Sequence, residues 1–251
     1  MGIVTHQTAN LFVASNPKNK TAALILAAGN STRMGGKQSK QFLTLDGIPV
    51  LAHTLLAYQR SPLIAEIVIA AREGEVDRVV EICDRFHITK LRAVVFGGTT
   101  RQESALRAFS VIGEDIRFVA IADGARCLIT PDEIDNVCIA AYRKKAASAG
   151  ARIVGTVKRT NTAGAVLETL DREALWEAQT PQVFHIALYA AAQHRAAADG
   201  FVGTDDNELV EHLGYRVMMV ECGRENIKIT TPTDIKIADA ILAARRKDAR
   251  K

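Results

Sequence analysis

The sequence lacks the features that mark membrane, fibrous or disordered proteins. Its apolar runs are far shorter than the roughly 20 residues that a membrane-spanning helix needs, so we expect no membrane segment. Aromatic residues make up only 5% of the chain, yet 48% of its 251 residues are hydrophobic, enough for the core of one large domain. Neither sign of charge dominates, because 32 basic and 28 acidic residues give a net charge of +4. That balance does not predict a nucleic-acid partner.

Cysteine is also scarce, and its spacing excludes the common metal sites. The four cysteines are Cys83, Cys127, Cys138 and Cys222, and no two form a C-x-x-C pair. We therefore expect no zinc site and no metal held by protein ligands alone. The first residues do not show the basic start and long apolar core of a signal peptide. These observations predict reduced thiols and a cytoplasmic protein.

Apolar runs typical of buried strands alternate with segments of helical periodicity. Strands are expected at 22–28, 64–71, 91–96 and 117–123, and helices near 49–60, 75–86 and 101–112 and from Pro131 onward. Thr130 and Glu133 form a capping box around Pro131, and Thr231 to Asp234 repeats the pattern before the last helix. The alternation predicts an α/β fold with three layers, a Rossmann-like and mostly parallel sheet covered by helices on both faces. Ligands of such sheets bind beyond the carboxyl ends of the strands.

One segment interrupts the alternation. Residues 151–172 read as two extended stretches around a polar turn at Thr160 to Gly164, which is the pattern of a β-hairpin inserted in the fold. A hairpin of this size buries little surface alone, so we expect this segment, the arm, to pack on the body or on a second subunit. Residues 1–20 resemble an added extension, followed by a single domain over 21–251.

The loop after the first strand is rich in positive charge. The apolar run Ala22 to Ala28 ends at Gly29, and Arg33, Lys37 and Lys40 follow. Glycine lets backbone N–H groups approach a phosphate, and arginine and lysine bind its oxygens. A solvated basic loop is the plainer alternative, but this many cations at the tip of a buried strand favour a bound anion.

The two common phosphate-binding motifs do not fit this loop. A P-loop needs G-x-x-x-x-G-K followed by Ser or Thr. Here Gly36 and Lys37 are followed by Gln38, and no glycine lies at the first position of the motif. The dinucleotide pattern G-x-G-x-x-G lacks its middle glycine at Ser31. The loop therefore belongs to another class of anion-binding site.

Further sequence blocks follow the loop in a fixed order. After L-A-A-G-x-x-x-R-M and K-Q-F come G-G-T-T-R-Q-E-S (97–104), D-G-A-R (123–126), G-T-V-K-R (155–159), D-R-x-x-L-W-x-A-x-T-P-Q-x-F (171–184), T-D-D (204–206) and N-I-K-I-T (226–230). Together they span residues 22 to about 245. In this order they resemble the 2-C-methyl-D-erythritol 4-phosphate cytidylyltransferases, sugar-nucleotide-type nucleotidyltransferases of the non-mevalonate isoprenoid pathway.

The resemblance implies an activity. Such an enzyme transfers the cytidylyl group of CTP to 2-C-methyl-D-erythritol 4-phosphate, giving 4-diphosphocytidyl-2-C-methyl-D-erythritol and diphosphate. The attacking oxygen belongs to the acceptor phosphate and is already anionic, so the site needs cations rather than a strong base. The resemblance also implies Mg²⁺ carried by the CTP phosphates, and a homodimer formed through the arm.

The resemblance further implies roles for individual residues. Arg33 and Lys40 would stabilise the transition state and the leaving diphosphate, and Arg172 and Lys228 would position the acceptor phosphate. Nucleotide contacts are expected from Ala27, Ala28, Gly29, Gly98, Ser104 and Asp123. Acceptor contacts are expected from Asp123, Arg126, Thr156, Thr180 and Thr204, with Thr156 or Arg172 acting across the dimer interface.

Each assignment has a plainer structural alternative. Arg126 and Arg172 could be ion-pair partners, Asp123 could cap a turn, and Ser104 could be a helix-surface residue.

The chain departs from the usual family pattern at four positions. Ala122 stands where histidine is common, Cys127 and Ser39 where proline is common, and Gly155 where an acidic residue is common. We expect Ala122 and Gly155 to lie on the acceptor side, so they leave the acceptor open. The alternatives are ribitol 5-phosphate or another polyol phosphate as acceptor, and a non-catalytic nucleotide-binding homologue.

Overall fold

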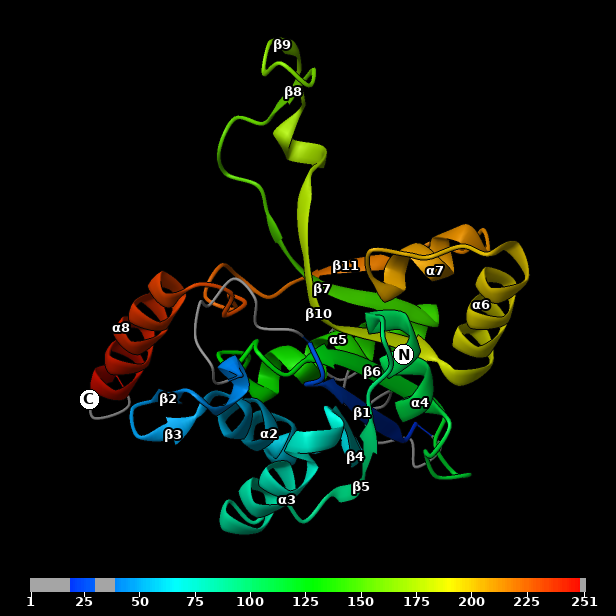
Figure 1. The fold of residues 1–251 in the computed structure, drawn as a ribbon. Helices are drawn as coiled ribbons and strands as arrows, with labels where there is room; N and C mark the ends of the chain where they lie inside the picture. The colour runs from blue at the N-terminus through cyan, green and yellow to red at the C-terminus, as the bar shows by residue number, and fades with distance from the viewer. Residues whose placement is uncertain (1–18, 30–38, 249–251) are drawn as a thin grey trace, which may run out of the picture.

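A seven-stranded sheet forms the centre of the molecule (Figure 1). The computed structural model describes residues 19–29 and 39–248. The strands, in their order across the sheet, are β11 (Met218–Glu221), β7 (Ala146–Arg152), β10 (Trp176–His185), β6 (Phe118–Asp123), β1 (Thr21–Leu26), β4 (Ile64–Ala71) and β5 (Leu91–Phe96). All neighbouring pairs are parallel except those of β10, which runs antiparallel to both β6 and β7. The sheet is therefore mostly parallel, as predicted.

The side chains of β1 alternate between two apolar layers, one on each face of the sheet. Ala23 and Ile25 belong to the cluster that contains the buried faces of three helices: α2 (Val50–Arg60), α3 (Val76–Arg85) and α5 (Pro131–Lys144). Ala22 and Leu24 belong to the opposite cluster, with α4 (Arg101–Phe109), α6 (Ile186–Asp199) and α7 (Asp206–His212). Because successive side chains of a strand point to opposite faces, this strand is buried on both sides. The predicted three-layer α/β class is confirmed.

The last helix packs beside the sheet rather than on its two faces. This helix, α8 (Pro232–Asp248), shares a third apolar cluster with the short hairpin of β2 (Thr44–Leu45) and β3 (Ile48–Pro49). Asp234 fixes its start, because its carboxylate accepts hydrogen bonds from the backbone N–H groups of Thr230 at 2.8 Å and Thr231 at 2.7 Å. The segment before α8, which carries Lys228, is thereby tied to a defined helix start.

Every element predicted from periodicity is present, but the second half of the chain holds strands that periodicity missed. The predicted strands are β1, β4, β5 and β6, and the predicted helices are α2, α3, α4 and α5. The pattern does not predict β7, whose sequence AASAGAR lacks the β-branched and aromatic residues typical of strands. Space is tight there, because a Cβ atom on Gly150 would lie 3.1 Å from the carbonyl oxygen of Glu177 and 3.3 Å from Cε3 of Trp176.

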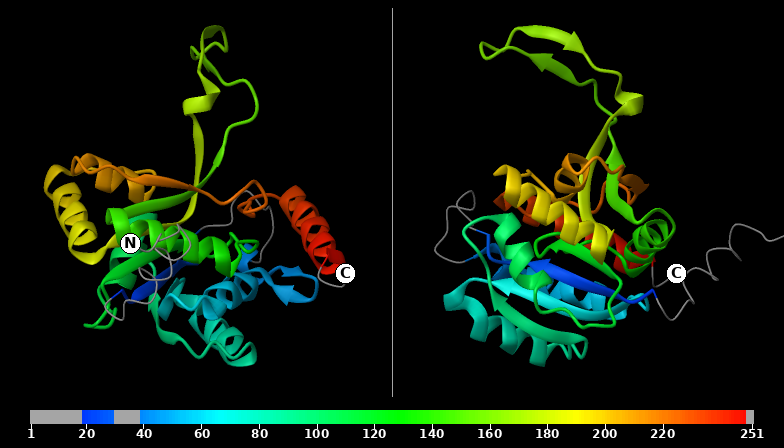
Figure 2. Two further views of the ribbon diagram at one scale, coloured as in Figure 1. Left: turned by 180° about the vertical axis from the view of Figure 1, so that it is seen from behind. Right: turned by 90° about the vertical axis from the view of Figure 1, so that its right-hand side faces the viewer.

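The predicted arm is present and projects from the body (Figure 2). Its outer part is an antiparallel hairpin of β8 (Lys158–Thr160) and β9 (Val166–Thr169), and a 3₁₀ turn over Arg172–Ala174 leads back to β10. The base of the arm continues the pairing of β7 with β10. Both outer strands are exposed throughout.

Some expectations fall on residues that the structure does not describe. The extension at 1–20 lies outside the described residues except for Asn19 and Lys20, and Arg33 and Lys37 lie outside them as well. Within the described part of the chain, no helix is both long enough and apolar enough to cross a membrane. All four cysteines are buried and unpaired, as expected for reduced thiols.

The capping box of α5 gives a test of the local folding argument. Thr130 Oγ1 accepts from the Glu133 N–H at 3.2 Å, and Glu133 Oε2 accepts from the Thr130 N–H at 2.8 Å. We expect Thr130→Ala to lower the free energy of unfolding by about 1 kcal/mol, because one helix-end donor loses its acceptor. Urea denaturation followed by circular dichroism measures this. The control is Thr162→Ala in the exposed turn of the arm; an equal loss in both variants would contradict the capping argument.

Candidate active site

A cavity of about 760 Å³ opens at the carboxyl ends of the parallel strands. The lining residues that the structure describes come from six segments: Leu26, Ala27, Ala28 and Gly29 at the end of β1; Lys40 and Gln41; Arg72 and Glu73 after β4; Gly97, Gly98, Thr99, Thr100, Arg101 and Ser104 after β5; Asp123, Gly124 and Ala125 at the end of β6; and Lys228. This is the edge where α/β sheets bind their ligands.

Two glycines after β5 allow close contacts at this edge. A Cβ atom on Gly97 would lie 2.2 Å from Cβ of Ala28, and one on Gly98 would lie 2.2 Å from Cβ of Glu103 in α4. Real Cβ atoms do not come so close, so a larger residue at 97 would push the β5 loop away from the end of β1, and one at 98 would push it away from α4. Gly97 therefore allows the β5 loop to lie against the end of β1.

Asp123, at the end of β6, is the electrostatic centre of the cavity. Its Oδ2 lies 2.8 Å from Nζ of Lys228, and its Oδ1 lies 3.5 Å from Nε of Arg101. Burial alone would raise the pKa of the Asp123 carboxyl, but the charges of Lys228 and Arg101 outweigh it and lower that pKa to about 2. Asp123 is therefore ionised at neutral pH and holds cations at the mouth of the sheet.

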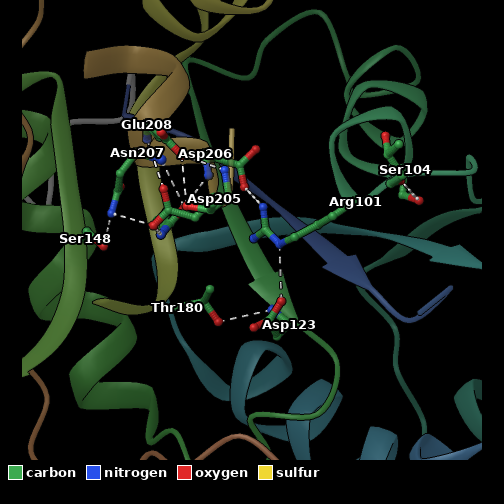
Figure 3. Close-up of polar contacts among 12 residues, drawn as sticks. Arg101, Ser104, Asp123, Ser148, Thr180, Asp205, Asp206, Asn207 and Glu208 are labelled. Carbon is green, nitrogen blue, oxygen red and sulfur yellow. Dashed lines mark hydrogen bonds and ion pairs between the residues drawn. The ribbon is translucent and has the colours of Figure 1, made fainter. Parts of the chain in front are cut away.

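Arg101, at the first position of α4, bridges two carboxylates (Figure 3). It contacts Asp123 on one side and pairs with the carboxylate of Asp206 on the other. Burial opposes the charge of Arg101, but the Asp206 carboxylate prevails, so the pKa of the guanidinium is raised. Arg101 therefore stays charged although little of its side chain reaches solvent.

Asp206 is fully buried and is held by residues of α6 and β10. Its Oδ1 accepts from the Tyr189 hydroxyl at 2.7 Å, and that hydroxyl accepts from Nε2 of Gln193 at 2.7 Å. The Asp206 backbone N–H donates to Oε1 of Gln182 at 2.9 Å. Polar contacts thus connect α6 and β10 through Asp206 to Arg101, which lines the cavity.

The segment that carries Lys228 lies at the cavity edge, and hydrogen bonds with buried residues fix it. Arg126 Nη1 donates to the carbonyl of Asn226 at 2.6 Å. The side-chain amide of Asn226 donates to Oε1 of Gln179 and to the carbonyl of Thr180, both at 3.0 Å. From the other side, Lys40 Nζ donates to the carbonyl of Ile229 at 2.7 Å. Lys40 and Lys228 are therefore brought to the same edge although 188 positions separate them.

The charge of the cavity favours an anion. Its described lining has four cationic side chains, Lys40, Arg72, Arg101 and Lys228, against the carboxylates of Glu73 and Asp123. After β5 the backbone N–H groups of Gly97, Gly98 and Thr99 are bonded within the protein, so the cationic side chains supply most of the attraction for an anion. The arrangement suits a polyanion such as a nucleotide phosphate chain.

All six predicted nucleotide residues line the cavity. This group comprises Ala27, Ala28, Gly29, Gly98, Ser104 and Asp123, and the predicted cations Lys40 and Lys228 join it. Ser104 is buried, and its hydroxyl accepts from the Gly98 N–H at 3.0 Å and donates to the carbonyl of Thr100 at 2.9 Å. Its hydroxyl therefore shapes the β5 loop as well as lining the cavity.

The predicted acceptor residues are more scattered. Arg126 and Thr180 are buried beside Asp123. Thr180 Oγ1 accepts from the Asp123 N–H at 3.1 Å. Thr204 is exposed and donates to Oε2 of Glu208. Thr156 and Arg172 lie on the arm, and neither is among the described lining residues. Arg33 lies outside the described residues.

Ala122 does not face the cavity. It is 1% exposed and belongs to the core cluster on the α2, α3 and α5 side of the sheet. Its side chain packs in the core while its neighbour Asp123 lines the cavity, and the expectation that Ala122 lies on the acceptor side stays a prediction. Gly124 and Ala125, which follow Asp123, do line the cavity.

Sequence reasoning missed two cations of the cavity. Arg101 belongs to the G-G-x-x-R block, and Arg72 follows directly after buried β4. The rule that singled out the loop after β1, a cation just beyond a buried strand, would have found Arg72 as well. For Arg101 the signal was its place in the first turn after a glycine pair; its burial between two carboxylates was not visible in the sequence.

Among residues 19–29 and 39–248, no group of three or more His, Cys, Asp or Glu side chains could hold a metal ion. Asp123 and Glu73 are the carboxylates of the described lining. Any divalent cation of this cavity would thus depend mainly on ligand oxygens, with Asp123 as the carboxylate nearest to the lysines.

Comparison with known proteins gives a consistent result. Residues 21–244 match the family model described as 2-C-methyl-D-erythritol 4-phosphate cytidylyltransferase. The protein of that name from Halalkalibacterium halodurans is 39% identical over 226 residues, covering 90% of this chain and 98% of that protein. The protein of that name from Caldanaerobacter subterraneus is 40% identical over 222 residues, covering 88% and 98%.

Solved structures agree in fold. The crystal structure of 4-diphosphocytidyl-2C-methyl-D-erythritol synthase from Anaerococcus prevotii has a TM-score of 0.81 at 28% identity, covering 90% of this chain and 99% of that chain. The 2-C-methyl-D-erythritol 4-phosphate cytidylyltransferase from Thermus thermophilus has a TM-score of 0.72 at 29% identity, covering 88% and 98%.

The bridge through Arg101 can be tested by stability. We expect Arg101→Met to lower the free energy of unfolding by roughly 3 kcal/mol, because Asp206 is left as a buried charge without its cation. Adding Asp206→Asn should recover at least about 1 kcal/mol, since the unpaired charge is then gone. Urea denaturation at pH 7 measures both, with exposed Arg60→Met as the control. A double variant no more stable than Arg101→Met would contradict the bridge.

Proposed function

This chain belongs to the 2-C-methyl-D-erythritol 4-phosphate cytidylyltransferase family, and from this membership we infer what it does. It is a nucleotidyltransferase that transfers the cytidylyl group of CTP to 2-C-methyl-D-erythritol 4-phosphate. The products are 4-diphosphocytidyl-2-C-methyl-D-erythritol and diphosphate, and the reaction belongs to the non-mevalonate isoprenoid pathway. The observation that carries our assignment of the site is the cavity itself, which Lys40, Lys228 and Asp123 line together.

We propose that the cavity residues act by binding and orienting two anions. An oxygen of the acceptor phosphate attacks the α-phosphorus of CTP; a new P–O bond forms, and the bond to the departing diphosphate breaks. Lys40, with Arg33, stabilises the charge on the α-phosphate and on diphosphate. Lys228, with Arg172, orients the acceptor phosphate. No side chain has to remove a proton, so the chemistry needs fixed positive charge in place of a base.

The nucleotide fits the glycine-rich half of the cavity. We propose that backbone groups of Ala27, Ala28 and Gly29 contact the phosphate chain, and that Gly98 and Ser104 face the cytosine. Support comes from the lining, in which these residues border one cavity. Asp123 lies between this half and Lys228, where the sugar hydroxyls and the acceptor would meet, with Arg126, Thr180 and Thr204 on the acceptor side.

A divalent cation, Mg²⁺, is expected with the triphosphate. The donor set fits such a carried ion, since Asp123 can contribute one carboxylate while phosphate oxygens supply most ligands. When bound, the ion would neutralise part of the triphosphate charge and help to orient it. Lys228 and Arg101 hold Asp123 in an ionised state ready for this contact.

We propose that the protein is a homodimer through its arm. Thr156 and Arg172 lie on a projection that points away from the body (Figure 2), so they could serve a second copy. The arm also exposes three large apolar side chains, Val154, Val166 and Leu167, each by more than half of its surface. A partner subunit would cover them.

We also propose a cytoplasmic location. The unpaired buried cysteines are consistent with it, because disulfides are rare in that compartment.

The first test measures diphosphate release from CTP and Mg²⁺ with 2-C-methyl-D-erythritol 4-phosphate, beside ribitol 5-phosphate. We expect kcat/KM to favour the erythritol phosphate by about 100-fold, because a site shaped for one polyol leaves polar groups unpaired with another. The control without acceptor should release no diphosphate. Preference for the pentitol would overturn the acceptor, and silence with both would indicate a non-catalytic nucleotide-binding protein.

The second test asks whether the arm serves the partner's cavity. Arg172→Ala and Lys228→Ala should each lower kcat by about 100-fold, as expected for loss of one preorganised cation. Mixed and allowed to exchange subunits, they should form heterodimers in which one cavity has both residues, restoring up to about a quarter of wild-type activity. Exposed Lys236→Ala is the single-site control, and each variant mixed with itself is the mixing control. Activity that stays low after proven exchange would refute action across the interface.

A further inference from the structure

The short connection between β4 and α3 contacts two segments of the cavity that are distant from it in sequence. This connection carries Arg72 and Glu75, which lie 3.9 Å apart as an ion pair. One of the two segments leaves β1 at Ala27 to Gly29, and the other is the 3₁₀ turn Lys40–Phe42 with the preceding Ser39. Neither Arg72 nor Glu75 has a role in the mechanism proposed above.

Arg72 holds the segment that leaves β1. Its Nη2 donates to the carbonyl of Gly29 at 2.9 Å, and its Nε donates to the carbonyl of Ala28 at 3.4 Å. Both acceptors belong to the stretch expected to contact the nucleotide. Arg72 therefore fixes the backbone at the end of β1 while it also pairs with Glu75.

Glu75 holds both neighbours of Lys40. Its Oε1 accepts from the hydroxyl of Ser39, and its Oε2 accepts from Nε2 of Gln41 at 2.8 Å. The same Nε2 donates to the carbonyl of Ala27, so Gln41 joins the turn to the end of β1. Ser39 and Gln41 are buried, at 6% and 3% exposure. The backbone on either side of Lys40 is therefore tied to one carboxylate.

We propose that Glu75 is a positioning residue for Lys40: by binding Ser39 and Gln41 it fixes the turn from which the Lys40 ammonium reaches the cavity. Lys40 Nζ lies 2.7 Å from the carbonyl of Ile229, beside Lys228. A long, flexible side chain meets that point only if its backbone is fixed. The inference rests on the proposed function, in which Lys40 stabilises the transition state.

The backbone at Ser39 shows a second way to fix the same turn. Its φ is −61° and its ψ is 137°, and proline locks φ near −65°. A proline would therefore fit this backbone and restrain it without any side-chain bond. In this chain the restraint comes from the Ser39 hydroxyl and Glu75, so the two devices should substitute for one another.

An electrostatic explanation makes the opposite prediction. If Glu75 acted only through its negative charge, removing it would make the cavity more positive and strengthen CTP binding. Glu75→Gln removes the charge but keeps an oxygen that Ser39 can bind, whereas Glu75→Ala removes both. If Glu75 acts by positioning, kcat should fall from wild type to Glu75→Gln and further to Glu75→Ala. If it acts by charge alone, the two variants should have the same kcat.

The experiment measures kcat and KM for CTP and for the acceptor in Glu75→Ala, Glu75→Gln, Ser39→Pro and Glu75→Ala/Ser39→Pro. Exposed Glu81→Ala on α3 is the matched control. We expect Glu75→Ala to lower kcat by about 10- to 100-fold, the cost of a slightly misplaced catalytic group, with little change in KM for the acceptor. Ser39→Pro alone should lose less than about threefold, and in the Glu75→Ala background it should restore kcat at least about threefold.

The outcomes separate the proposal from its premise. Wild-type activity is read first, and its absence counts against the proposed function alone. If wild type is active, either of two results would overturn positioning by Glu75: a wild-type kcat in Glu75→Ala, or no recovery of kcat when Ser39→Pro is added. CTP binding that is equally tight in both Glu75 variants, and tighter than in wild type, would also overturn it. If Glu75→Ala does not fold, as judged by circular dichroism, the rescue is measured on Glu75→Gln instead.

Discussion

Repulsion between like charges is the constraint on which this site depends. At the carboxyl edge of the sheet, Lys228, Arg101 and Arg126 all lie within 4 Å of the Asp123 carboxylate. Without that carboxylate, three buried or half-buried cations would face one another in a medium of low dielectric constant. Asp123 makes their convergence possible, and their charges in turn keep it ionised although it is buried.

Asp123 can do this because the fold holds it from several directions. Parallel β1 and β6 bring the end of β6 next to the end of β1, and antiparallel β10 brings Thr180 to its backbone N–H. Asp206, at the start of α7, also pairs with Arg101, so the charge of Arg101 is divided between Asp206 and Asp123. Residues more than a hundred positions apart thus act as one charge network, which explains why the strand order matters more to the site than any single motif.

The sequence predicted the first half of the fold and much of the cavity, for physical reasons that also set the limit. Buried parallel strands such as β4 are continuous apolar runs, and a capping box such as Thr130 with Glu133 is a local signal; both are readable one segment at a time. β7 was missed because its small residues, such as Gly150, pack closely against Glu177 and Trp176 of β10, a contact that only the assembled sheet creates. Arg101 and Glu75 were missed for the same reason. Their partners Asp206 and Ser39 lie far away in the chain, and neither pairing leaves a pattern at fixed spacing. The burial of Ala122 in the core was not readable either, because motif position says nothing about which face of a strand a residue takes.

The cations of the cavity are held by two kinds of acceptor, and the difference bears on how the site can bind an anion. Lys40, Arg72 and Arg126 donate to carbonyl oxygens of Ile229, Gly29 and Asn226. A carbonyl orients a cation but leaves its net charge in place. Lys228 and Arg101 face carboxylates, which orient them and also cancel charge. An arriving phosphate must therefore compete with Asp123 for Lys228. The carbonyl-held lysine is thus suited to charge that develops on the α-phosphate and the leaving group, and the carboxylate-held lysine to an acceptor phosphate that binds as a full anion.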